Sequence, residues 1–420
     1  MKLSKVLSGL AAMLLAGSAA VTAQNSTLTP YSRYGYGILG DNATSAQRAM
    51  GGVGYAMNSG RQINVMNPAS YAMCDSLTFL FDMGVDFTTL WQKESVGGKN
   101  LSEKRYGGGL DYITMQVPVW KGLGASLGVL PYSSVGYAFG NDIDDGVADR
   151  QGSGSINQLY LGVGYRPFNG FALGVNFAYL FGNNYNDSYI TTDGGSTTLF
   201  ERQLEVRDWR MDIGLQYSRY IHPRHRLTAG IVYSPKKDMH GHAKTYSYDV
   251  NNQQNAPEEI ENIPLKGNYS LSETWGVGHA YEYDHRLFLE GDFTYQPWSK
   301  TKYRGVEQDG VTPQLADRYK IAGGLQYTPR PRGSYLQRVQ YRAGAFFNRD
   351  YLRIRDNNLR EYGLSIGFGL PVPSFKTIVS LGVEWRHRQA YPNPLIKENY
   401  INLTLGINFN EMWFRKSRIY

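Results

Sequence analysis

From about residue 77 onward, apolar and polar side chains alternate with a period of two in one segment after another. In 171–183, apolar residues occupy every second position from Phe171 to Phe181, whereas Gly174, Asn176 and Gly182 lie between them. Successive side chains of a β-strand point to opposite faces, so this period predicts strands that have one apolar and one polar face.

Fourteen segments of the chain show this alternation. They are 77–91, 106–118, 122–139, 155–166, 171–183, 207–221, 226–239, 269–283, 285–298, 317–328, 338–349, 361–370, 376–388 and 399–410. The alternation alone would also suit a soluble β-sandwich, because both folds bury one face of each strand.

Two further features favour a membrane barrel over a sandwich. The polar face carries glycines, amides and single charges, as a crowded polar lumen requires; the charged positions are Glu290, Asp292, Lys320, Arg342 and Glu384. The connections also alternate between short turns and long loops, which is typical of outer-membrane barrels. We therefore predict an all-β fold, a 14-stranded antiparallel transmembrane β-barrel. The even number of strands places both chain ends on the periplasmic side, and the long connections, such as 140–154, 184–206 and 240–268, are expected to be solvated loops.

The first 23 residues have the pattern of a secretory signal peptide. Lys2 and Lys5 precede an apolar core, and Val21-Thr22-Ala23 forms a small-residue cleavage site. We expect four regions: a signal peptide (1–23), an N-terminal periplasmic-side hatch or plug (24–76), the transmembrane barrel (77–410) and a periplasmic C-terminal tail (411–420). Such a signal implies export to the outer membrane of a Gram-negative bacterium.

The segment from Arg48 to Tyr71 is rich in glycine and small residues, yet it contains apolar residues that a solvated linker would not need. Met50, Val53 and Ile63 are examples. A compact, irregular segment ahead of a series of hairpins suggests a plug inside the barrel. A surface-lying N-terminal arm would explain the same composition.

Composition supports the barrel and excludes other classes. The chain has 33 Tyr, 17 Phe, 7 Trp and 48 Gly, with few long apolar runs, and only every second residue of a barrel strand meets lipid. Its single cysteine, Cys74, excludes an internal disulfide. Without Lys2 and Lys5, 41 basic side chains remain against 36 acidic ones. This modest, dispersed excess does not indicate nucleic-acid binding.

Several short motifs resemble those of one family. They are Arg48-Ala49-Met50-Gly51-Gly52 and Asn67-Pro68-Ala69 in the N-terminal segment, Gly-Leu-Gln-Tyr at 214–217 and 324–327, Tyr233-Ser234-Pro235-Lys236, and Gly406-Ile407-Asn408-Phe409. With the strand count, they make the chain similar to the FadL/TodX-type outer-membrane transporters of long-chain fatty acids and aromatic hydrocarbons. The opening Tyr31-Ser32-Arg33-Tyr34-Gly35 departs from that family's pattern and suggests a divergent branch.

The resemblance implies a hatch motif and a transport route. The hatch residues carried over are Arg48, Gly51, Gly52, Asn67, Pro68 and Ala69. In that family a hydrophobic ligand, captured among the extracellular loops, leaves sideways through an opening at a kink in the third strand. The third predicted strand contains Pro131, which removes a ladder hydrogen bond, between Gly128 and Gly136. A closed bulge without a role in transport would explain the same residues.

Other candidate sites are weaker. His240 and His242 could form a metal pair, but no third ligand is evident, so a solvated loop is favoured. Lys320, Arg342 and Arg386 could contact a ligand carboxylate, although pairing with Glu290, Asp292 or Glu384 explains them better. Without a nucleophile motif we expect no enzymatic activity, and we expect no cofactor or metal.

Two functions are compatible with the sequence, and the first of them, transport, is the one we predict. The first is passive transport of a small hydrophobic molecule, which predicts an apolar pocket and a lateral gap near Pro131. The second is a non-transporting accessory or scaffold subunit of a larger outer-membrane secretion or assembly complex, which predicts a filled lumen and protein partners. Outer-membrane lipid surrounds the barrel in either case. Fold alone does not decide between the two functions.

Overall fold

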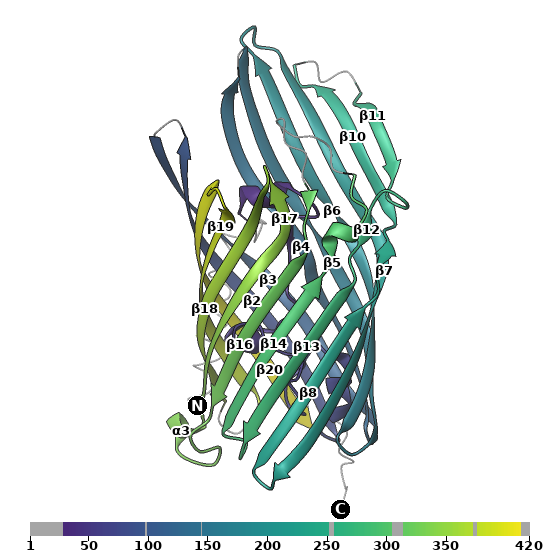
Figure 1. The fold of residues 1–420 in the computed structure, drawn as a ribbon, viewed down its shortest axis with the longest axis vertical. Helices are drawn as coiled ribbons and strands as arrows, with labels where there is room; N and C mark the ends of the chain where they lie inside the picture. The colour runs from purple at the N-terminus through teal and green to yellow at the C-terminus, as the bar shows by residue number, and fades with distance from the viewer. Residues whose placement is uncertain are drawn as a thin grey trace, which may run out of the picture.

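The computed structural model describes residues 28–96, 99–143, 145–251, 256–304, 314–372 and 376–412. The predicted signal peptide and nearly all of the predicted C-terminal tail lie outside these residues. The described chain forms a closed 14-stranded antiparallel barrel with an irregular N-terminal segment inside it (Figure 1). The predicted fold class is therefore confirmed.

All fourteen predicted strands are present, in sequence order around the wall. They are β2 (Thr78–Val96), β3 (Lys99–Trp120), β4 (Leu123–Ile143), β5 (Gly146–Phe168), β6 (Phe171–Thr192), β7 (Thr197–His222), β8 (His225–Ser234), β13 (Thr274–Tyr283), β14 (Leu287–Gln296), β16 (Arg318–Tyr327), β17 (Gln340–Ile354), β18 (Asn357–Pro371), β19 (Ile378–Tyr391) and β20 (Ile396–Met412). The barrel closes where β2 pairs with β20, from Thr78–Met412 to Glu94–Ile396. Closure leaves no unpaired edge where the first and last strands meet.

The remaining elements are short or lie outside the wall. They are η1 (Pro30–Arg33), β1 (Ile38–Leu39), α2 (Ser45–Arg48), η2 (Pro68–Met73), β9 (Lys237–Asp238), β10 (Gly241–Asp249), β11 (Glu258–Pro264), β12 (Ser270–Leu271), η3 (Trp298–Lys300), β15 (Gln314–Leu315) and α3 (Tyr335–Arg338). In the described ranges we find no helix of sufficient length and apolarity to cross a membrane.

Side chains of the wall alternate as the sequence predicts. In β6, Ala172, Asn176 and Ala178 are buried on the inside, whereas Phe177 on the opposite face is 52 % exposed. The outward-facing positions of the other strands are likewise exposed aliphatic or aromatic residues. The outer surface of the barrel is thus suited to lipid contact.

The prediction that the long connections are solvated loops is wrong for at least four of them, because β2 and β3 already extend through most of 92–105. β5, β6 and β7 continue through 146–154, 184–192 and 197–206, and β10 and β11 extend the same sheet beyond β7. These strands rise above the rest of the barrel (Figure 1). Beyond the lipid both faces of a strand can be polar, so the apolar alternation disappears while the backbone pairing continues.

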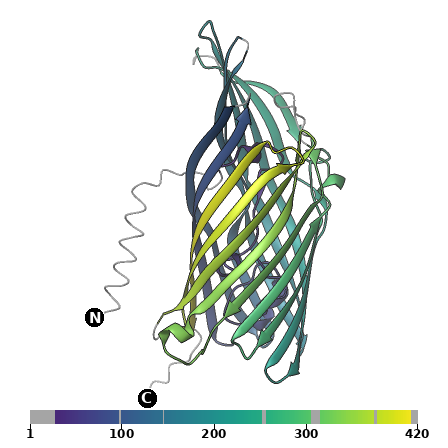
Figure 2. The same cartoon turned by 60° about the vertical axis from the view of Figure 1, so that its left-hand side comes forward.

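The N-terminal segment, 28–76, lies inside the barrel (Figures 1 and 2). It starts near the upper ends of the closing strands, where Thr29 Oγ1 donates to Glu398 Oε1 at 2.6 Å and Gln92 donates to the Leu28 carbonyl. The start of β2 and the end of β20 lie together at the short-turn end of the barrel, where both chain ends were predicted. That prediction is wrong for the start of the described chain.

Candidate functional site

Inward-facing glycines of the wall make room for the N-terminal segment. A Cβ atom on Gly230 would collide with the Tyr55 carbonyl, and one on Gly344 would collide with the backbone at Gly51. A Cβ atom on Gly124 or Gly174 would likewise collide with backbone atoms of the segment. Backbone therefore packs on backbone at several points around the barrel, which leaves little free volume between wall and segment.

The Asn67-Pro68-Ala69 motif forms the start of η2. The Asn67 side chain accepts a hydrogen bond from the Ala69 N–H at 3.1 Å and donates to the Tyr55 carbonyl at 2.7 Å. Pro68, whose ring suits the first position of a helix, lies against Gly174 and Gly214 of the wall. This motif thus fixes the local turn and also positions it against β6 and β7.

The Arg48-Ala49-Met50-Gly51-Gly52 motif ends α2. Gly51 and Gly52 have φ angles of +75° and +77°, a conformation that favours glycine, and the Gly51 N–H donates to Ser365 Oγ at 2.9 Å. Arg48 donates to the Asp111 carboxylate of β3 at 2.8 Å. Asp111 is buried, so this ion pair joins the segment to the wall inside the lumen.

Two inward carboxylates of β14 hold a second part of the segment. Asp292 accepts from the backbone N–H groups of Gly54 and Tyr55 at 2.7 and 3.0 Å, and Glu290 accepts from that of Ala56 at 2.6 Å. Three consecutive backbone N–H groups of the segment thus find acceptors on one wall strand. The lumen carboxylates predicted from the strand pattern therefore bind the chain's own backbone.

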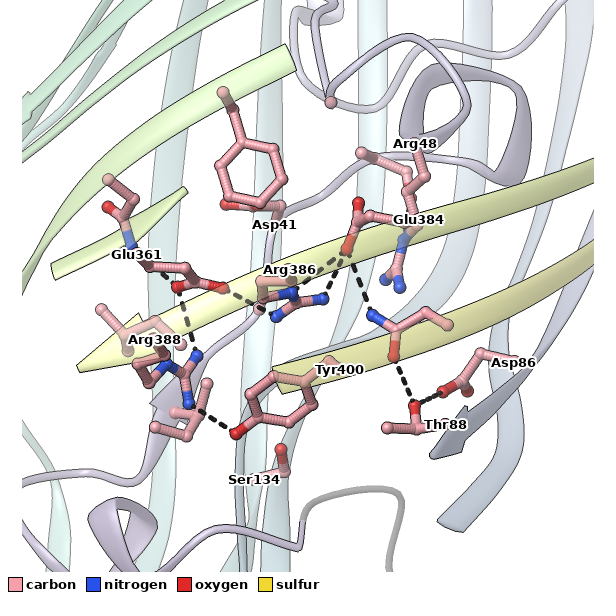
Figure 3. A pocket seen from close by; sticks show the side chains of 18 of the residues that line it. Asp41, Arg48, Asp86, Thr88, Ser134, Glu361, Glu384, Arg386, Arg388 and Tyr400 are labelled. Atoms are coloured by element: carbon pink, nitrogen blue, oxygen red, sulfur yellow. Dashed lines mark hydrogen bonds and ion pairs between the residues drawn. The ribbon is translucent and has the colours of Figure 1, made fainter. Parts of the chain in front are cut away.

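A cavity of about 170 Å³ remains between the segment and the wall. Its lining includes six carboxylates and five cations: Asp41, Asp86, Asp111, Asp350, Glu361 and Glu384, with Arg48, Arg318, Lys320, Arg386 and Arg388 (Figure 3). Such a lining contrasts with the mostly hydrophobic walls of pockets that hold apolar ligands.

Asp41 of the segment lies between two cations of β16, with Lys320 Nζ at 2.6 Å and an Arg318 nitrogen at 3.1 Å. Burial raises the pKa of the Asp41 carboxyl, but Lys320 and Arg318 together lower it, and the net pKa is well below its usual value. The prediction that Lys320 forms its ion pair with Glu290, Asp292 or Glu384 is therefore wrong. Asp41 follows no strand pattern, so its pairing there could not be predicted from the sequence.

Arg386 behaves as predicted, because it pairs with Glu384 at 2.8 Å and also with Glu361 at 3.0 Å. Next to it, Arg388 pairs with Glu361 at 3.2 Å (Figure 3). Arg342 instead donates to neutral groups, among them Ser380 Oγ at 2.9 Å. The predicted contact of Lys320, Arg342 and Arg386 with a ligand carboxylate stays a prediction.

The third wall strand, β4, leaves its neighbour close to Pro131. The β3–β4 ladder ends at the Ile113–Val129 pair, just past Gly128, and a bulge follows between Pro131 and Ser133. Beyond this point β1 takes the place of β3, because Ile38 and Leu39 pair with Ser134 and Ser133. The two wall strands thus separate where the sequence predicted a distortion, and the N-terminal segment covers the edge of β4.

Side chains continue this covering of β4. Ser32 Oγ accepts from the Gly136 N–H at 3.0 Å, and Arg105 of β3 donates to the Ala138 carbonyl. Gly136, predicted as part of the strand at the lateral opening, thus hydrogen-bonds to the Tyr31-Ser32-Arg33-Tyr34-Gly35 stretch. The edge of β4 thus finds hydrogen-bond partners in β1, Ser32 and Arg105 where its ladder with β3 has ended.

The same stretch leads into an aromatic cluster at the upper end of the lumen. Tyr36, fully buried, contacts the rings of Tyr269, Trp298 and Tyr303. Tyr351 packs on Trp298 with ring centroids 4.9 Å apart and the rings tilted by 42°. This cluster was not among the predicted site residues. Its only sequence signal was the Tyr- and Gly-rich stretch that departs from the family pattern.

Replacing Tyr351 by phenylalanine should destabilise the barrel by about 1–3 kcal/mol. The Tyr351 hydroxyl accepts from the Tyr36 N–H at 2.9 Å and donates to the Gly37 carbonyl, so its removal leaves both groups buried without a partner. Urea unfolding in detergent micelles measures the loss. An unchanged unfolding midpoint would show that these hydrogen bonds do not hold the stretch in place.

His240 and His242, the candidate metal pair, have separate hydrogen-bond partners. His240 Nδ1 lies 3.0 Å from Asp208 Oδ1, and His242 Nδ1 lies 3.0 Å from Asn262 Oδ1. No group of three or more His, Cys, Asp or Glu that could hold a metal ion occurs within the described ranges.

Solved structures with the same fold are outer-membrane channels. A FadL homologue of Pseudomonas aeruginosa has a TM-score of 0.62 and 13 % identity over 89 % of this chain and 99 % of that one. The P. putida toluene transporter TodX has a TM-score of 0.62 and 12 % identity over 90 % of this chain and 100 % of that one. The Ralstonia pickettii toluene transporter TbuX has a TM-score of 0.54 and 13 % identity over 88 % of this chain and 98 % of that one. The fold is therefore an outer-membrane β-barrel of the FadL type, as the motifs predicted.

A more specific assignment comes from the sequence itself. A family model described as BamG matches residues 5–420, and the chain belongs to the BamG family. No curated protein sequence matches the chain.

Proposed function

We propose that this chain is a non-transporting accessory subunit of a larger outer-membrane assembly or secretion complex, with its N-terminal segment as a permanent plug. The observation that carries the proposal is the lumen. Ion pairs join the segment to β3 and β16, hydrogen bonds join it to β14 and β18, and the cavity that remains is lined by charged groups. A hydrocarbon would have to desolvate these groups without offering them any partner.

Co-purification tests this proposal. The chain, with an affinity tag in an extracellular loop, is extracted from native outer membranes in mild detergent and passed over a size-exclusion column. We expect proteins that remain bound in fixed ratios, and a FadL-type barrel tagged in the same way should lack them. Elution as a single chain carrying one fatty acid or aromatic molecule would contradict the proposal.

Passive transport of a small hydrophobic molecule, with release beside β4, is the second candidate. The early end of the β3–β4 ladder favours it, since a lateral exit needs a break between neighbouring strands. TodX and TbuX, which share the fold, are described as toluene transporters. This route would require β1 to leave the edge of β4.

A disulfide between β1 and β4 separates the two candidates. Leu39 and Ser133 are direct cross-strand partners, a spacing that disulfides can bridge. In a Cys74→Ser background, the oxidised Leu39→Cys/Ser133→Cys variant should still bind the co-purifying proteins, because an accessory subunit does not require the plug to move. The readouts are uptake of labelled fatty acid or toluene by cells and recovery of the co-purifying proteins. Uptake that stops on oxidation and returns on reduction would instead establish transport.

A further inference from the structure

The short turns on the periplasmic side of the barrel are strongly basic. The six turns between β3 and β4, β5 and β6, β7 and β8, β13 and β14, β16 and β17, and β18 and β19 contain a single acid, Asp284. Against it stand seven cations, which we call the basic rim: Lys121, Arg224, Arg286, Arg330, Arg332, Arg338 and Lys376.

The cations of the basic rim lack carboxylate partners, unlike those of the lumen. Within the described ranges no carboxylate lies within 4.0 Å of any of the seven, whereas Arg48, Lys320 and Arg388 in the lumen are all paired. The Nε atoms of Arg286 and Arg338 are even buried without an acceptor. The rim therefore presents unneutralised positive charge to whatever lies beneath the barrel.

Outward-facing aromatic residues lie beside these turns. Trp120 and Phe168 are 78 % and 60 % exposed, and Tyr217, Tyr327 and Phe368 are also exposed near the same ends of their strands. Aromatic girdles mark the level of the membrane–water interface. The cations beyond this girdle consequently lie at the height of the lipid headgroups.

The turn between β16 and β17 extends furthest from the wall and carries α3 (Figure 2). Leu336 is 69 % and Tyr335 42 % exposed, and Arg330, Arg332 and Arg338 belong to the same turn. Exposed apolar residues among arginines combine the two features of segments that lie in a membrane interface.

We propose that the basic rim binds anionic phospholipid headgroups of the inner leaflet. The arginines offer paired N–H donors that match phosphate oxygens. The cations occur on five of the six turns around the barrel rather than in one patch, which fits a continuous leaflet better than a single acidic protein. This inference is independent of whether the chain is an accessory subunit or a transporter.

Native mass spectrometry of the purified full chain tests the inference. The protein in detergent is titrated with phosphatidylglycerol or with phosphatidylcholine of the same acyl chains. We expect phosphatidylglycerol to be retained at about tenfold lower concentration. The triple variant Arg330→Ala/Arg332→Ala/Arg338→Ala should lose most of this preference.

The matched control removes three exposed cations at the opposite end of the barrel, as Lys93→Ala/Lys266→Ala/Lys300→Ala. It should keep the preference for phosphatidylglycerol, because its cations lie far from the rim. Equal retention of both lipids by the native chain would overturn the inference and favour an acidic periplasmic protein as the partner of the rim. Equal loss in the triple variant and the control would overturn it as well, since only net charge would then matter.

Discussion

Replacing Arg48 by methionine is expected to destabilise the barrel by about 3–5 kcal/mol. The substitution keeps an unbranched apolar stem but leaves the buried Asp111 carboxylate without its partner at 2.8 Å. Asp86 and Glu384 line the same cavity, so its six carboxylates would then be balanced by one cation fewer. Urea unfolding in detergent micelles measures the change in the free energy of unfolding.

Two controls show whether this loss comes from the ion pair inside the lumen. Arg61, in the same segment, pairs with Asp75 at 3.5 Å, but the two side chains are 70 % and 46 % exposed. Arg61→Ala should therefore change stability by no more than about 1 kcal/mol. The double variant Arg48→Met/Asp111→Asn should recover most of the loss, because no buried charge is then unpaired. Equal effects of the Arg48 and Arg61 substitutions would contradict the proposed locking of the segment.

Replacing Gly324 by alanine should destabilise the barrel by about 1–3 kcal/mol. Gly324 faces inward on β16, and a Cβ atom there would lie well inside van der Waals contact with the Met50 carbonyl oxygen. The segment would have to move away from the wall or the strand would have to bend. The same urea titration measures this loss.

The neighbouring Gly323 provides the control for this substitution. It points to the other face of β16, and a Cβ atom there would have no atom within 4 Å. Gly323→Ala should leave stability unchanged or raise it slightly, since alanine restricts the unfolded chain. If both substitutions had the same effect, the inward face of the strand would not be packed against the segment.

The fold could be predicted from the sequence because its signal is local. Each strand has its own alternation, and the lipid outside forces apolar residues onto one face, as in 171–183 and 399–410. The alternation disappears where the wall leaves the lipid. The upper parts of β5, β6 and β7 consequently looked like loops, although their backbones pair as regularly as those below.

The candidate site could be predicted only in part, because its partners are distant in sequence. Pro131 and the inward charge at Lys320 could be found from their strands alone. The pairing of Lys320 with Asp41 depends on how an irregular segment crosses the lumen, and no periodicity describes such a segment. The aromatic cluster around Tyr36 depends in the same way on contacts with residues from 269 to 351.

The most direct test of a permanently plugged, non-transporting barrel is equilibrium binding of radiolabelled long-chain fatty acid and toluene to the purified chain. We expect no saturable binding of either compound, because the lumen cavity is lined by charged groups that an apolar ligand cannot pair. Saturable binding of one molecule per barrel, abolished by the Leu39–Ser133 disulfide, would contradict this account and make the chain a transporter.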